Sequence, residues 1–268
     1  MCIRDRVKAA CKEWLDTFGI GALNGTATDK LVAALDGIDC PVCRDIVKNK
    51  DFLAKKSQWV FGGDGWAYDI GFGGVDHVLA SGKDINIMVF DTEVYSNTGG
   101  QSSKATPTGS VAQFAAGGKD VKKKDLASIA MSYGYVYVAQ IAMGADYNQT
   151  VKALAEAEAY PGPSLVIAYA PCINHGIKKG MSKAQTEEKL AVEAGYWHNF
   201  RFNPAAENKF TLDSKAPTGD YQAFLKGEVR YASLALKNPE RAAVLFEKNE
   251  EAAKERYAYL SLSLIHIS

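Results

Sequence analysis

The sequence lacks the features that mark membrane-spanning, secreted or nucleic-acid-binding proteins. Lys plus Arg and Asp plus Glu both number 31 among 268 residues, so no net charge favours nucleic acid or an anionic membrane. No apolar run approaches the roughly 20 residues that a membrane-spanning helix needs, and no secretory signal opens the chain. We therefore expect a cytoplasmic protein that binds neither nucleic acid nor a membrane.

Cysteine is also scarce, and the number of cysteines is odd. The five are Cys2, Cys11, Cys40, Cys43 and Cys172. An odd number in a chain of this length without a signal peptide argues against a disulfide framework. Reduced thiols or metal ligation are expected instead.

The two ends of the chain do not fit the sequence patterns of the segments next to them. Residues 1–6 and 262–268 look like translated sequencing-adapter sequence, and we leave them out of the reasoning on the fold. On this hypothesis, the natural protein extends beyond both ends. Finding the same codons in contiguous genomic DNA would refute it.

The rest of the chain has the composition of an ordinary globular protein, with 47% hydrophobic and 23% charged residues. Apolar residues at helical spacing predict that residues 7–56 form a helical lead-in of the same domain as the segment that follows. Residues 57–196 then alternate between short apolar strands and helices. This alternation predicts an α/β core with a mostly parallel sheet and helices on both faces. Residues 197–260 are expected to form an irregular arm and a C-terminal helix. Strands are expected at 58–61, 85–90, 135–141 and 164–169, and helices at 67–79, 125–133, 147–159, 183–195 and 239–259.

Three polar loops fall at the carboxyl ends of the expected strands, where α/β sheets bind their ligands: 62–66, 91–108 and 170–181. The first contains Gly62-Gly63-Asp64-Gly65. Glycines let the backbone approach a phosphate, but an acid among them would repel it unless the acid binds a divalent cation. The alternative is a tight strand-to-helix turn with Asp64 as its N-cap.

The second loop begins Asp91-Thr92-Glu93-Val94-Tyr95-Ser96-Asn97 and offers several oxygen ligands within a short distance. Mg²⁺ prefers six oxygens, and a carboxylate, a hydroxyl and a carbonyl from two loops would supply three of them. The alternative is a solvated surface loop, since these residue types also form turns. A structureless loop of this length is uncommon in a compact domain without a function.

These two loops together resemble a known family. The runs 62–71 (GGDGWAYDIG) and 91–101 (DTEVYSNTGGQ) are similar to pyruvate:ferredoxin (or flavodoxin) oxidoreductase, in its C-terminal thiamine-diphosphate-binding domain. The similarity continues through 133–139, 161–169 and 195–197, and covers about residues 28–260. It implies a thiamine-diphosphate-binding fold within a longer multidomain chain.

The resemblance also implies roles for individual residues. Asp64, the Thr92 side chain and the Val94 carbonyl would ligate Mg²⁺. Asn97 would also face the reacting carbon, where its amide can hydrogen-bond a developing negative charge. The residues implied to bind the cofactor are Gly63, Asp64, Gly65, Trp66, Thr92, Glu93, Val94, Tyr95, Ser96 and Asn97.

A lone cysteine such as Cys172 is usually a small buried residue, but the resemblance implies that it is one ligand of a [4Fe–4S] cluster. The other three ligands have no certain match here. Cys40-Pro41-Val42-Cys43 has thioredoxin-like spacing, but it lies outside the family's ligand positions, and we interpret it as two incidental cysteines.

Other charged residues and histidines have weaker signals. The run Lys119–Lys124 is expected to be a solvated loop, with docking of an acidic ferredoxin as the alternative. His77 is expected on a helix face, and His175 is a possible supporting group behind Cys172. No role is assigned to His198.

The family's activity is the oxidative decarboxylation of pyruvate with coenzyme A to acetyl-CoA and CO₂, with electrons passing to iron–sulfur clusters. Ferredoxin or flavodoxin would accept the electrons, and a homodimer is implied. The carboxylic acid that activates the coenzyme comes from a domain absent here, so we expect the chain to be inactive alone. Two alternatives are a non-redox thiamine-diphosphate decarboxylase or synthase and a non-catalytic nucleotide-binding module.

Overall fold

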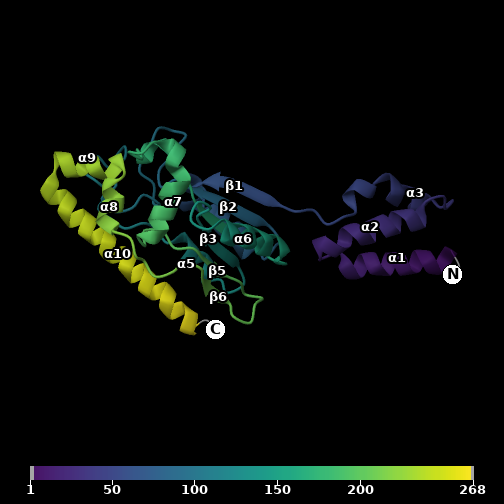
Figure 1. Cartoon of the computed structure of the whole chain (residues 1–268). Helices are drawn as coiled ribbons and strands as arrows, with labels where there is room; N and C mark the ends of the chain where they lie inside the picture. The colour runs from purple at the N-terminus through teal and green to yellow at the C-terminus, as the bar shows by residue number, and fades with distance from the viewer. Residues whose placement is uncertain (1–2, 267–268) are drawn as a thin grey trace. The chain divides into compact units, whose positions relative to one another are not determined.

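The computed structural model describes residues 3–266 and the side chains of residues 4–263 (Figure 1). It divides into two compact units, Met1–Gln58 and Trp59–Ser268. The domain boundaries expected near residues 56 and 196 stay predictions, although the second of them does not separate compact units. Residues 1–2 and 267–268 of the two proposed adapter-derived ends lie outside the described part.

The smaller unit is helical. It consists of α1 (Ile3–Thr17), α2 (Gly21–Leu35), α3 (Pro41–Lys48) and a short 3₁₀ turn, η1 (Lys50–Phe52). Its core joins α1 and α2 through Ala10, Leu31 and Leu35, with Cys43 of α3 packed at the edge. The Trp14 indole also donates a hydrogen bond of 3.1 Å to the Thr28 hydroxyl, which ties α1 to α2.

The larger unit contains one six-stranded sheet in the order β1-β2-β4-β3-β5-β6. The first four strands in this order are parallel, and β5 and β6 continue the sheet in antiparallel pairing. The strands are β1 (Trp59–Gly63), β2 (Asn86–Asp91), β3 (Tyr137–Ile141), β4 (Ser164–Tyr169), β5 (Phe200–Phe202) and β6 (Phe210–Leu212).

Helices cover both faces of this sheet. Successive side chains of a strand point to opposite faces, and the two hydrophobic clusters follow this alternation. Met88 and Val166 pack with α6 on one face, whereas Ile87 and Leu165 pack on the other face with the remaining large helices. The helices of the unit are α4 (Phe72–Ala80), α5 (Leu126–Met131), α6 (Tyr147–Ala159), α7 (Ala184–Glu193), α8 (Tyr221–Lys226), α9 (Val229–Lys237) and α10 (Pro239–His266). The predicted fold class is therefore confirmed.

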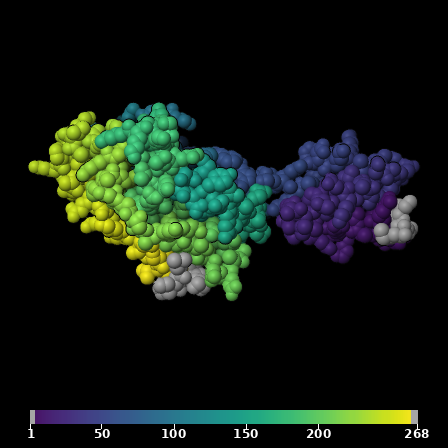
Figure 2. Space-filling view, in the orientation of Figure 1, coloured from purple at the N-terminus to yellow at the C-terminus, as the bar shows by residue number. Residues whose placement is uncertain are grey.

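Two segments differ from the predicted elements. The helix expected at 67–79 begins instead as a π-helical turn, η2 (Gly65–Ile70), before α4. The arm expected to be irregular contains β5, β6, α8 and α9. It packs onto α10, which runs along one edge of the larger unit (Figure 2). Short 3₁₀ turns η3 (Ile173–His175) and η4 (Met181–Lys183) lie in the loop after β4.

Within residues 3–266, no helix is both long enough and apolar enough to cross a lipid bilayer.

Candidate functional site

The candidate site lies where β1 and β2 end side by side. The two strands are parallel, and Gly63 pairs with Phe90 at their carboxyl ends. Asp64 follows β1 directly and Thr92 follows β2 directly, so both residues leave the same edge of the sheet. This topology brings together two loops that the sequence separates by 28 positions.

The Thr92 hydroxyl is the centre of a small group of oxygen atoms. Its Oγ1 lies 2.8 Å from Asp64 Oδ1 and 3.0 Å from the carbonyl oxygen of Val94. The Ser96 hydroxyl oxygen also lies 2.6 Å from Thr92 Oγ1. The three residues predicted to ligate Mg²⁺ thus meet at one point, and their metal role stays a prediction.

These oxygens open onto a cleft of about 440 Å³. Of the residues predicted to bind the cofactor, all except Glu93 line it. The lining consists of Phe61, Gly62, Gly63, Asp64, Gly65, Trp66, Phe90, Thr92, Val94, Tyr95, Ser96, Asn97 and Thr98. Asn97 is exposed in this lining, so its amide is free to meet a bound molecule.

Asp64 is fully buried, and its charge is poorly compensated. Thr92 donates to Oδ1 from its backbone N–H, and the Ser103 hydroxyl donates to Oδ2 at 2.6 Å. Burial, and then the negative charge of nearby Asp91, raise the pKa of Asp64 to about 6. A cation in contact with this carboxylate would stabilise its ionised form.

Among the described residues, no three His, Cys, Asp or Glu side chains are grouped to hold a metal ion. A cation at Asp64 would therefore need the hydroxyl of Thr92, the carbonyl of Val94 and oxygens from outside the chain. Such an oxygen-only set suits Mg²⁺ better than a transition metal.

Two glycines of the first loop lie against aromatic rings, and a third, Gly63, has open space beside it. A Cβ atom at Gly65 would lie 2.4 Å from the Tyr95 ring, and one at Gly62 would lie 2.3 Å from the Trp66 ring. At Gly63 the nearest atom would be a backbone oxygen 4.0 Å away. Gly63 is therefore the glycine that leaves room in the cleft, and the other two allow its aromatic walls to pack.

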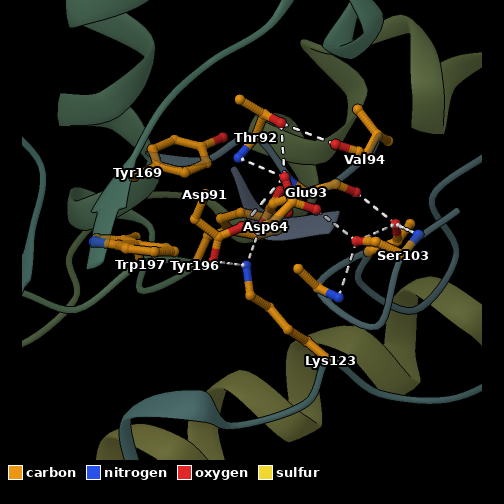
Figure 3. Close-up of polar contacts among 12 residues, drawn as sticks. Asp64, Asp91, Thr92, Glu93, Val94, Ser103, Lys123, Tyr169, Tyr196 and Trp197 are labelled. Atoms are coloured by element: carbon orange, nitrogen blue, oxygen red, sulfur yellow. Dashed lines mark hydrogen bonds and ion pairs between the residues drawn. The ribbon is translucent and has the colours of Figure 1, made fainter. Parts of the chain in front are cut away.

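Glu93 points away from the cleft, into the interior. Its backbone is left-handed, with φ of 60°. Its carboxylate contacts Lys123 at 2.9 Å and the Tyr196 hydroxyl at 2.6 Å (Figure 3). It also forms an ion pair of 2.8 Å with Arg230. Burial alone would raise the pKa of Glu93, but the charges of Lys123 and Arg230 outweigh it and hold the pKa at about 2.

The basic run is not a uniformly solvated loop, so that expectation was wrong. Lys123 reaches inward and contacts both Asp91, at 2.7 Å, and Glu93. Lys119 donates to the carbonyl oxygens of Ser103 and Thr106, and its pKa is lowered to about 8 by burial and by Lys123. The sequence signal for these inward lysines was absent, because their partners lie in other loops.

A second cavity of about 470 Å³ lies on this inner side. Glu93, Lys123 and Tyr196 are among its lining residues, as is His198. Burial, and then the nearby Arg256 guanidinium, lower the pKa of His198 to about 4. The imidazole is therefore neutral at physiological pH.

The loop after β4 packs against the second loop of the site. His175 Nε2 lies 2.8 Å from the carbonyl oxygen of Thr92, so this nitrogen carries the proton and donates it. Asn174 packs against Gly100, where a Cβ atom would lie 2.7 Å from its side-chain oxygen. Asn174 also donates to the Cys172 sulfur at 3.4 Å. Cys172 is thus held beside the loop that forms the cleft.

The remaining candidates lie elsewhere. Cys40 and Cys43 belong to the smaller unit, and His77 is exposed in α4. Four residues that shape the site were not predicted to do so from the sequence. They are Ser103, Lys123, Tyr196 and Arg230.

Comparisons with known proteins show which family the chain is similar to. Residues 47–168 match the family model of the thiamine pyrophosphate enzyme C-terminal TPP-binding domain. The chain is 56% identical over 264 residues to a pyruvate-flavodoxin oxidoreductase of Klebsiella pneumoniae, which covers 96% of this chain and 22% of that protein. It is 56% identical over 260 residues to a pyruvate:ferredoxin oxidoreductase of Moorella thermoacetica, covering 93% and 22% respectively.

The chain therefore spans about a fifth of the length of these relatives. A solved 2-oxoglutarate:ferredoxin oxidoreductase from Magnetococcus marinus resembles it only weakly, with a TM-score of 0.44 and 20% identity over 82% of this chain and 74% of that one.

Proposed function

Because this chain belongs to the family of pyruvate-flavodoxin and pyruvate:ferredoxin oxidoreductases and contains a thiamine pyrophosphate-binding domain, we propose that its cleft holds the diphosphate of thiamine diphosphate through Mg²⁺. The single observation that carries the proposal is the meeting of Asp64, Thr92 and Val94 oxygens around one hydroxyl. Diphosphate oxygens and water would complete the six ligands that Mg²⁺ prefers.

The neighbouring residues would bind the rest of the cofactor. Gly63 leaves space for the diphosphate, and the rings of Trp66 and Tyr95 form the walls of the cleft. Ser96 and Asn97 follow on the same loop. We assign Asn97 to the reacting centre, because its exposed amide can donate to an oxygen that gains negative charge in the reaction.

Thiamine diphosphate, when bound, supplies the carbanion and electron-sink chemistry that 2-oxoacid decarboxylation needs. The chain's own contribution is to hold the Mg²⁺ that would neutralise the diphosphate and to orient the loop. His175 orients the loop by donating to the Thr92 carbonyl oxygen, which holds the backbone just after β2. Glu93 anchors the same loop from its inner side.

For the complete protein we propose oxidative decarboxylation of pyruvate with coenzyme A, with ferredoxin or flavodoxin as electron acceptor and a homodimeric assembly. Cys172 would supply one ligand of a [4Fe–4S] cluster, and its position beside the cofactor loop supports this role. The other described cysteines lie in the smaller unit, so we expect the remaining ligands from other parts of a longer chain. The acid that activates the coenzyme is expected from another domain as well.

Calorimetric titration tests the proposal. We expect heat of binding for thiamine diphosphate with Mg²⁺, and little for thiamine diphosphate with a chelator, for Mg·ATP or for NAD. Thr92→Val should lower the affinity roughly tenfold or more, because it removes one metal ligand.

Thr98→Val is the matched control for this experiment. Thr98 lines the same cleft, but its hydroxyl contacts Gln101 at 2.6 Å instead of Asp64. We expect it to retain wild-type affinity. Binding that is unaffected by the chelator, or equal for Mg·ATP, would reject the proposal and favour a nucleotide-binding module.

A further inference from the structure

Two cysteines that the proposed function does not use lie together at the start of α3. Cys40 is the N-cap of the helix, with an extended backbone of φ −142° and ψ 130°. Cys43 is the third residue within the helix. The N-cap and the third helical residue are less than one helical turn apart, so both thiols lie at the amino end of α3.

The environments of the two thiols differ. Both are partly exposed, so a reagent can reach them. Cys43 packs at the edge of the hydrophobic core of the smaller unit, together with Val47 and Cys11. Cys40 lies before the helix, next to Asp39, which forms an ion pair with Arg44. The Cys43 side chain is thus held by packing, whereas Cys40 lies at the N-cap, outside this core.

Interactions between the two residues also make the pair chemically unequal. The backbone N–H and then the thiol of Cys43 stabilise a thiolate at Cys40, which lowers the pKa of Cys40. The thiol of Cys43 is in turn harder to ionise, so the pKa of Cys43 is raised. Pro41 fits the first helical position because no N–H is needed there.

We propose that Cys40 and Cys43 form a thiol–disulfide exchange site that closes to an intramolecular disulfide on reaction with a disulfide-bonded co-reactant. In the first step the Cys40 thiolate attacks one sulfur of the co-reactant, forming a mixed disulfide and releasing one thiolate. In the second step Cys43, after losing its proton, attacks the Cys40 sulfur and releases the second thiolate. The two cysteines lose two electrons and two protons, and the co-reactant's disulfide is reduced to two thiols.

Peptide mapping after reaction with oxidised glutathione tests this proposal on the whole chain. Trypsin cuts after Lys30 and Arg44, so one peptide carries both cysteines, whereas Cys11 and Cys172 fall in other peptides. We expect this peptide to lose two hydrogen masses without retaining glutathione. Cys11 and Cys172 serve as internal controls, which should instead keep single glutathione adducts.

Single variants distinguish an exchange site from two independent thiols. In Cys43→Ser the adduct on Cys40 should persist, because no second thiol displaces it. In Cys40→Ser the remaining Cys43 should react roughly tenfold more slowly than Cys40 does in the other variant. The proposal is overturned if the wild-type peptide carries separate adducts on both residues, or if Cys40 reacts no faster than Cys11. Neither result bears on the thiamine diphosphate site, which lies in the other unit.

Discussion

The segment from Asp91 to Val94 has one side that faces the cleft and one side that faces the protein interior, and the two sides differ in burial and charge. Thr92 and Val94 present a hydroxyl and a carbonyl to the cleft, where Asp64 meets them. Asp91 and Glu93, which alternate with them, point inward and are almost fully buried among Lys123, Arg230 and tyrosine hydroxyls. The side that would bind a ligand is open and incompletely charge-compensated, whereas the side that supports it is closed and ion-paired.

This difference indicates that the buried side holds the backbone of the cleft loop in place. A left-handed backbone at a glutamate is unfavourable, and it persists only where the surroundings hold it. At Glu93 the carboxylate is held by Lys123 and Arg230, and the Thr106 hydroxyl donates to its carbonyl oxygen at 2.5 Å. We infer that the buried charges set the backbone conformation and that this conformation turns the Thr92 and Val94 oxygens toward Asp64.

The largest expected effect comes from breaking the inner side with Arg230→Met. Arg230 is buried between Glu93 and Glu228, at 2.8 and 2.7 Å, and its loss leaves both carboxylates without that charge. We expect a loss of about 3–5 kcal/mol in the free energy of unfolding, measured by denaturant titration.

Two further variants check the cause of this loss. Arg241→Met removes an exposed pair with Asp120 and should cost at most about 1 kcal/mol. Adding Glu93→Gln to Arg230→Met should recover part of the loss, because one uncompensated charge is then removed. Equal losses for Arg230→Met and Arg241→Met would contradict the supporting role of the inner side.

Breaking the cleft side with Asp64→Asn should affect binding instead of folding. We expect the affinity for thiamine diphosphate with Mg²⁺ to fall roughly hundredfold, about 3 kcal/mol, because the charged metal ligand is lost. The free energy of unfolding without ligand should stay equal or rise, since burial and Asp91 disfavour the ionised carboxylate that is replaced. Asp69→Asn, which alters the contact with Lys104, is the control and should keep the affinity. A destabilised Asp64→Asn variant would show that Asp64 is part of the support.

Acid should weaken the inner side through His198. Its folded-state pKa of about 4 lies below the unfolded value of about 6.5, so the unfolded chain binds more protons between these pH values. Stability from this group is therefore complete above pH 6.5 and is lost as the pH falls toward 4, by about 3 kcal/mol. His198→Phe should remove this part of the pH dependence in thermal or denaturant unfolding, and His77→Gln, at an exposed position, should not. Identical acid profiles for the wild type and His198→Phe would be the contrary result.

The smallest expected effect is a difference in unfolding free energy between alanine substitutions at Gly63 and Gly65, the two glycines beside Asp64. Gly65→Ala places a methyl group 2.4 Å from the Tyr95 ring and should cost about 1–3 kcal/mol of stability as the ring shifts. Gly63→Ala meets no atom closer than 4.0 Å and should change the unfolding free energy by less than about 1 kcal/mol. Equal effects in unfolding experiments would mean that Tyr95 does not pack against the first loop as described.

Local patterns in the sequence predicted much of the α/β core. Helix α6 and strand β4 have the expected bounds, because apolar periodicity and the break at Pro161 to Pro163 are local signals. Strands β5 and β6 were missed because three residues are too few to show alternation, and the pairing of β5 with β3 joins segments far apart in the sequence.

The candidate site divides in the same way. The oxygens around Asp64 and Thr92 could be predicted, because each follows a strand directly and the family's motif covers both. Lys123 and Arg230 could not be predicted, because their role depends on meeting Glu93 across the fold. Within the sequence, Lys123 is one of several neighbouring lysines, and nothing local distinguishes the inward side chain from the outward ones.

The most direct test of the central claim is a crystal structure with thiamine diphosphate and Mn²⁺, in which anomalous scattering locates the ion. We expect one peak, about 2.1 Å from the Asp64 carboxylate, the Thr92 hydroxyl and the Val94 carbonyl, and in contact with the diphosphate. A peak bound by other residues, or a diphosphate bound in the cleft with no ion at Asp64 and Thr92, would contradict it.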